Sequence, residues 1–144
     1  MNPTTLQEMR RFFGLSPFMV DLGVEPVELG QGQLVTELVV APRHLQHTGV
    51  VHAGVLATLA DHTMGATAQT LAPPGHWILT AELKTSMLRG AQGERLVCHA
   101  RVLKPGRLIS FTEAEVFAER GGQRTLCMKA SATMAVAPAR EAPR

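Results

Sequence analysis

The chain has 144 residues, of which 45% are hydrophobic and 18% are charged, a composition typical of one globular domain with a sizeable core. Its formal net charge is only +2 and the basic residues are scattered, which argues against a dedicated nucleic-acid surface. No apolar run approaches the roughly 20 residues of a membrane helix, and the first residues lack the pattern of a secretory signal. We therefore expect a soluble, cytoplasmic protein with a single domain over residues 1–137.

The first part of the sequence predicts a short helix followed by two strands. Thr5 and Glu8 have the spacing of a capping box, and the apolar stripe that follows predicts a helix over residues 5–13. This helix and its lead-in occupy residues 1–19. Two segments rich in Leu and Val, separated by glycines, predict paired strands over residues 24–29 and 33–40.

A long apolar helix is predicted over residues 53–71, and Pro73 follows its end. The segment carries almost no charge and has no clearly polar face, which is typical of a buried helix. Asp61 lies near its middle. Because a buried carboxylate is costly unless it is paired or used, Asp61 is the first candidate for a functional residue.

The rest of the chain consists of long strand-like segments joined by short turns. The residues from Trp77 to Met87 follow a period of two, which predicts one long strand with regular alternation. Short turns predict antiparallel neighbours, so the economical fold is α+β, with a twisted antiparallel meander around the long helix. One such sheet leaves an edge uncovered, and we therefore expect a homo-oligomer, either a dimer or a dimer of dimers. The strands are predicted over residues 77–87, 96–103, 108–118 and 125–136, before a disordered tail over residues 138–144.

The cysteines and histidines give weaker signals. Cys98 and Cys127 lie in strand-like segments without CxxC spacing, which predicts buried free thiols in a reducing compartment. Four histidines fall within 19 positions, but the sequence has no HExxH motif. We expect no metal at these histidines, which are His44, His47, His52 and His62.

The segment from His52 to Asp61 reads HAGVLATLAD, and it follows two predicted strands and precedes four. This motif and element order resemble the hotdog-fold thioesterases, in particular the branch with the phenylacetate-pathway thioesterase and human thioesterase superfamily member 2. That branch has a loop Asn, a His-Gly-Gly helix start and an Asp nine residues after the His, whereas this chain has Gln46 and Ala53 at the Asn and first Gly positions. The resemblance covers residues 20–136 and implies a hotdog fold that hydrolyses acyl-CoA thioesters.

Thioester hydrolysis requires a base or nucleophile, an oxyanion site and a grip on the acyl carrier. Asp61 is the candidate base or nucleophile, and the sequence does not separate these two roles. The backbone N–H groups of Ala53 and Gly54 are expected to be unpaired donors at the positive end of the helix dipole, where they can polarise the carbonyl. The resemblance adds catalytic roles for Gln46, His52 and Thr80, although a loop-fixing His52 and an ordinary strand threonine at position 80 are equally compatible with the sequence.

The spacing of the motif favours a site shared between subunits. Ala53 and Asp61 are eight residues apart, or about 12 Å along a helix, so one carbonyl cannot reach both. Two helices from two subunits must then supply them. Gln46, His52 and Ala53 are expected from one chain, and Asp61 and Thr80 from the other.

The acyl carrier is expected to be CoA, with acyl carrier protein as the second choice, and no further cofactor is implied. Its phosphates favour basic residues at the rim of the site. The predicted substrate-binding residues are His47, Arg89, Lys104, Arg107 and, for the acyl part, Met64. A non-catalytic acyl-CoA-binding module and a hotdog dehydratase or hydratase are the alternatives, and the acyl group itself cannot be inferred from the sequence.

Overall fold

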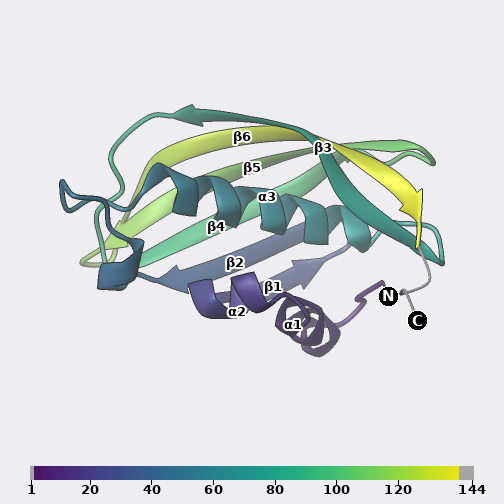
Figure 1. The fold of residues 1–144 in the computed structure, drawn as a ribbon, viewed down its shortest axis with the longest axis horizontal. Coiled ribbons are helices and arrows are strands. Elements are labelled where there is room, and N and C mark those ends of the chain that lie inside the picture. Colours follow the sequence, from purple (N-terminus) through teal and green to yellow (C-terminus); the bar gives the residue numbers. More distant parts are fainter. Residues whose placement is uncertain (1, 140–144) are drawn as a thin grey trace.

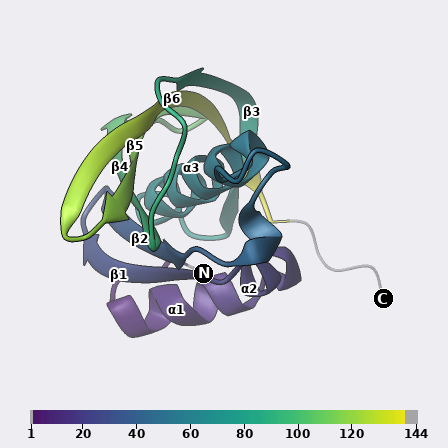
Figure 2. The same ribbon diagram turned by 90° about the vertical axis from the view of Figure 1, so that its left-hand side faces the viewer.

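One antiparallel sheet of six strands curls around a long helix, α3 (Ala53–Gln69), in the computed structural model, which describes residues 2–139 (Figure 1). Viewed from one end, the sheet is a C-shaped wall around α3 that is open between β3 and the two N-terminal helices (Figure 2). The predicted architecture of a long helix wrapped by an antiparallel sheet is confirmed. In their order across the sheet, the strands are β1 (Val24–Gly30), β2 (Gln33–Val39), β4 (Arg95–Lys104), β5 (Ile109–Arg120), β6 (Gln123–Pro138) and β3 (His76–Met87).

Strands β3 and β4 are consecutive in the chain, but β5 and β6 lie between them in the sheet. The predicted meander is therefore wrong at this connection, because β3 pairs with β6 while β4 pairs with β2 and β5. Three strand spacings, or about 14 Å, separate β3 from β4. Residues 88–94 connect them. Because an extended chain covers about 3.3 Å per residue, this short connection is long enough to span the distance across the two intervening strands.

Two helices lie at the N-terminal side of the fold. In α1 (Leu6–Gly14) the predicted capping box is present, since the Thr5 hydroxyl accepts the N–H of Glu8 at 3.2 Å and the Glu8 carboxylate accepts the N–H of Thr5 at 3.1 Å. The helix packs against β1. The second helix, α2 (Pro17–Leu22), was not predicted, because it has only six residues, too few to show a helical period, and Gly23 ends it with a φ of +83°.

Helix α3 is buried where it faces the sheet and uncovered where it faces the opening, so the predicted burial of the whole helix is wrong. On the inner side, Leu59 and Met64 are 0% exposed. On the outer side, residues three and four positions apart share one face. This uncovered band of α3, which is exposed or partly exposed in the single chain, consists of Gly54, Ala57, Thr58, Asp61 and Gly65.

Cys98 and Cys127 are free and buried, as predicted. Burial raises the pKa of the Cys98 thiol to about 12, and the thiolate is the reactive form. We therefore expect neither thiol to react with an aromatic disulfide reagent at about pH 8 while the chain is folded, and both to react in urea. Colorimetric thiol titration measures this, and rapid reaction of the native protein would contradict it.

Candidate active site

The fold brings Asp61 and Thr80 together at the edge of the opening. The hydroxyl of Thr80 on β3 donates a hydrogen bond to Oδ1 of Asp61 on α3, at 2.7 Å. A β-bulge at Ala81 interrupts the pairing of β3 with β6. As a result Thr80 and Leu83 both face the helix although they are three positions apart. The predicted unbroken alternation along this strand is wrong, and the bulge is what allows Thr80 to reach Asp61.

The side chain of His52 caps the start of α3. Its Nδ1 accepts the N–H of Gly54 at 2.8 Å, so the expected unpaired donor at Gly54 is already used. The N–H of Ala53 has no hydrogen-bond partner within residues 2–139 and remains the free donor of this helix start. Because Nδ1 of His52 accepts, the neutral ring carries its proton on Nε2. The structure thus gives His52 the loop-fixing role and leaves its Nε2–H available.

Gln46 and Arg89 lie with Ala53 around an open hollow of about 300 Å³. The Gln46 side-chain amide donates to the Thr48 hydroxyl at 2.7 Å, and an Arg89 guanidinium nitrogen donates to the Leu126 carbonyl at 3.2 Å. Neither Asp61 nor Thr80 lines this hollow. Within one chain, the predicted catalytic residues therefore form two separate groups, one at the helix start and one in the middle of the helix.

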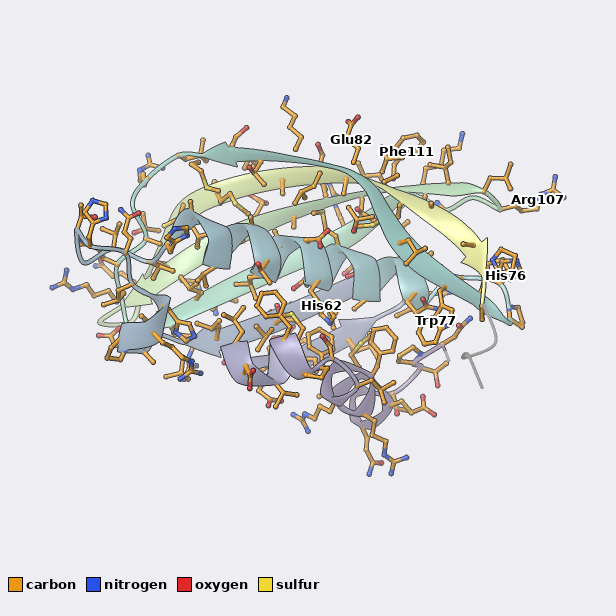
Figure 3. The ribbon with its side chains drawn as sticks, in the orientation of Figure 1. His62, His76, Trp77, Glu82, Arg107 and Phe111 are labelled. Carbon is orange, nitrogen blue, oxygen red and sulfur yellow. The ribbon has the colours of Figure 1, made fainter. Side chains whose placement is uncertain are left out.

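The predicted substrate-binding residues lie in three different places. His47 is exposed in the loop before α3, on the same side as the hollow. Lys104 and Arg107 are exposed at the β4–β5 connection, and Figure 3 shows Arg107 at the opposite end of the molecule, beside the start of β3. Met64 is 0% exposed in the core and does not line a surface of the single chain.

His62, which follows Asp61, has an unusual environment that sequence analysis did not indicate. The ring lies between α3 and the N-terminal helices (Figure 3), with the Phe13 ring edge-on at a centroid distance of 4.6 Å. Its Nε2 is buried and has no hydrogen-bond partner within residues 2–139. Burial lowers the pKa of His62, and the neighbouring Asp61 carboxylate only partly opposes this effect.

The lowered pKa of His62 predicts a loss of stability in mild acid. Below about pH 6.5 the unfolded chain binds a proton at this position that the folded chain resists, so the free energy of unfolding falls as the pH falls. We expect His62→Phe to flatten this dependence by up to about 1.4 kcal/mol per pH unit. Urea unfolding of both proteins between about pH 5 and 8 measures the difference, and parallel curves would show that His62 does not titrate in this way.

In the other histidine of the core, His44, both ring nitrogens have backbone hydrogen-bond partners. His44 is 1% exposed, its Nδ1 accepts the N–H of Ala41 at 2.9 Å, and its Nε2 lies 2.8 Å from the Leu22 carbonyl. Within residues 2–139, no three His, Cys, Asp or Glu side chains are grouped as they would be to hold a metal ion. In the same part of the chain, no helix has both the length and the apolar character needed to cross a bilayer.

Comparison with known families decides the identity of the fold. The family model of the thioesterase superfamily matches residues 48–125, which include the helix start, Asp61 and Thr80. The chain belongs to the thioesterase superfamily. The predicted resemblance to thioester hydrolases of the hotdog fold is thereby confirmed at the level of the superfamily.

Relatives within the thioesterase superfamily support the same assignment. A Caenorhabditis elegans protein provisionally named an esterase is 36% identical over 80% of this chain and 67% of its own length. Human acyl-coenzyme A thioesterase 13 is 29% identical over 62% of this chain and 64% of its own length. The chain thus spans about two thirds of the length of the curated relatives that it matches.

Solved structures share the fold of this chain. A thioesterase family protein from Silicibacter pomeroyi has a TM-score of 0.88 at 30% identity, over 92% of this chain and 97% of its own. A Bacillus halodurans protein crystallised with CoA has a TM-score of 0.66 at 24% identity, over 70% of this chain and 69% of its own, which shows a common fold.

Proposed function

We propose that the chain hydrolyses the thioester bond of acyl-CoA, releasing a carboxylic acid and CoA. The observation that carries this proposal is the hydrogen bond by which Thr80 holds the Asp61 carboxylate on the uncovered band of α3. The membership of the chain in the thioesterase superfamily supports the same reaction. Because Thr80 occupies Oδ1, Oδ2 is left to accept a proton from water, as a general base does. The name of the human relative and the CoA bound by the Bacillus halodurans neighbour support CoA as the carrier.

The active site of the proposed enzyme forms between two copies of the chain. β3 is the last strand of the sheet, and among residues 2–139 only β6 pairs with it, so its outer edge beside the opening is available to another chain. Antiparallel pairing of β3 with its copy would place the two openings, and the two uncovered bands, against each other. The free N–H of Ala53 in one chain then lies opposite Asp61 in the other. One thioester carbonyl can then reach both groups, although they are about 12 Å apart along a single helix. This homodimer can exist alone or as half of a tetramer.

The same two-fold arrangement brings the basic residues together. Antiparallel pairing places the start of one β3 beside the end of the other, so Lys104 and Arg107 of one chain approach Arg89 and His47 of its copy. These four residues form the proposed grip on the CoA phosphates, which bind best to guanidinium and ammonium groups.

Replacing Arg107 by Gln is expected to raise the KM for acyl-CoA about tenfold, the effect of losing one charge-assisted contact. The KM for an acyl-N-acetylcysteamine thioester should not change, because this substrate has no phosphates. The matched control is Arg101→Gln, which removes an exposed arginine paired with Glu113 on the outer face of the sheet. Equal effects on both substrates would place Arg107 outside the phosphate grip.

The proposed activity is tested by measuring CoA release from short, medium, long and aromatic acyl-CoA compounds. Turnover of at least one of them, lost in Asp61→Asn, is the expected result. CoA binding without any turnover would instead identify a non-catalytic acyl-CoA-binding module of the same fold.

A further inference from the structure

Two polar side chains project from the uncovered band of α3. They are Thr58 and Asp61, while its other positions are Ala57 and two glycines. Thr58 lies three residues before Asp61, which is about 4.5 Å along the helix axis. Helical side chains tilt towards the N-terminus, so the Asp61 carboxylate extends over the turn that holds Thr58. A hydroxyl and a carboxylate of α3 therefore stand next to each other, and the Thr80 hydroxyl of β3 holds the carboxylate from the other side.

The hydroxyl of Thr58 differs from those of the next threonines in the helix. Thr63 and Thr67 each donate to a backbone carbonyl of the preceding turn, at 2.6 Å. Thr58 makes no such bond to Gly54, and its hydroxyl has no hydrogen-bond partner within residues 2–139. Thr58 is only partly exposed, so its hydroxyl is both uncommitted and sheltered beside the base.

We propose that Thr58 is a further catalytic residue, which orients the hydrolytic water together with Asp61. This inference deepens the proposed function and rests on it. The water donates one hydrogen to Oδ2 of Asp61 and the other to Oγ1 of Thr58. Its lone pair then points away from the band, towards the thioester carbonyl at the helix start of the second copy.

The reaction balances with these groups alone. The water oxygen forms a bond with the carbonyl carbon while its first proton passes to Asp61. The carbon–sulfur bond breaks, the electron pair moves to sulfur, and Asp61 returns its proton to the sulfur. The products are the carboxylic acid and the CoA thiol. Thr58 holds the water in position by a hydrogen bond and neither gains nor loses a proton.

The test compares Thr58→Val, which removes the hydroxyl but keeps the shape, with Thr58→Ser, which keeps the hydroxyl. We expect Thr58→Val to lower kcat by about 10- to 100-fold, as expected for one lost hydrogen bond to the reacting water, with KM within about twofold of wild type. Thr58→Ser should retain most of the activity. The pH–rate profile of Thr58→Val should keep its shape, because threonine does not titrate.

Thr67→Val is the matched control, since it makes the same change on a hydroxyl already bonded within the helix. It should keep wild-type kcat, and thermal unfolding checks that all three variants are folded. A folded Thr58→Val protein with wild-type kcat would overturn the inference, and so would a Thr58→Ser protein as slow as Thr58→Val. Inactive wild-type protein would count against the proposed function itself, so the two failures are distinct.

Discussion

Asp61→Asn is expected to lower kcat by about 10³-fold, within the range found for loss of a general acid–base group. Asparagine has the shape of aspartate, and its amide oxygen can still accept the Thr80 hydrogen bond of 2.7 Å, so the fold should be retained. What is lost is the charge that takes the proton from water. Steady-state release of the CoA thiol, measured together with thermal unfolding, gives the result.

Asp21→Asn is the control for this change, because it is the same substitution at an exposed carboxylate on a different helix, α2. It should have wild-type activity. An Asp61→Asn protein that is folded and keeps more than about a tenth of wild-type kcat would place the base elsewhere. If Asp61 instead attacks the thioester directly, the CoA thiolate leaves and a mixed anhydride forms; water that opens this anhydride at the Asp61 carboxyl carbon would leave heavy oxygen in the side chain after a single turnover.

Ala53→Pro is expected to lower kcat by about 10²- to 10³-fold, the effect of removing one oxyanion donor. Proline has no N–H, yet it is favoured at the first position of a helix, which Ala53 occupies in α3. His52 before it has φ −60° and ψ 136°, values that are allowed before a proline. The control is Ala53→Ser, which keeps the N–H while adding an atom, and it should remain active if the donor rather than the space is what matters.

Mixing the two inactive proteins tests whether the site is shared. A dimer of one Ala53→Pro chain and one Asp61→Asn chain contains one site with both defects and one site with neither. Random exchange of equal amounts should therefore restore about a quarter of wild-type activity, since half of the dimers are mixed and each has one intact site. Absence of any recovery, with exchange shown by co-purification of differently tagged chains, would contradict a shared site.

Most helices and strands could be predicted because their signals are local. The capping box at Thr5, the proline after α3 and the glycines between strands each act within a few residues. The order of the strands could not be predicted, because β3 pairs with β6 through contacts distant in sequence. The bulge at Ala81 was missed for a similar reason, since no residue near it favours a bulge over regular alternation.

The candidate site was predictable where its chemistry contrasts with its surroundings. Asp61 stands out as a carboxylate in an apolar helix, and the resemblance to the thioesterases pointed to Thr80. The sequence could not show that the N–H of Gly54 is already hydrogen-bonded, because this depends on the conformation of the His52 side chain. The buried, unpaired nitrogen of His62 depends on the packing of α1, which the sequence places on the core without specifying its neighbours.

The pairing of β3 with β6 also decides when activity can arise during synthesis. Thr80 lies opposite Met134, which the ribosome adds 54 residues later. The β1–β2 hairpin and α3 can form early from local contacts, but β3 has no strand to join until β6 is made. A chain truncated before β6 would therefore contain both Asp61 and Thr80 and still lack the support that holds them together.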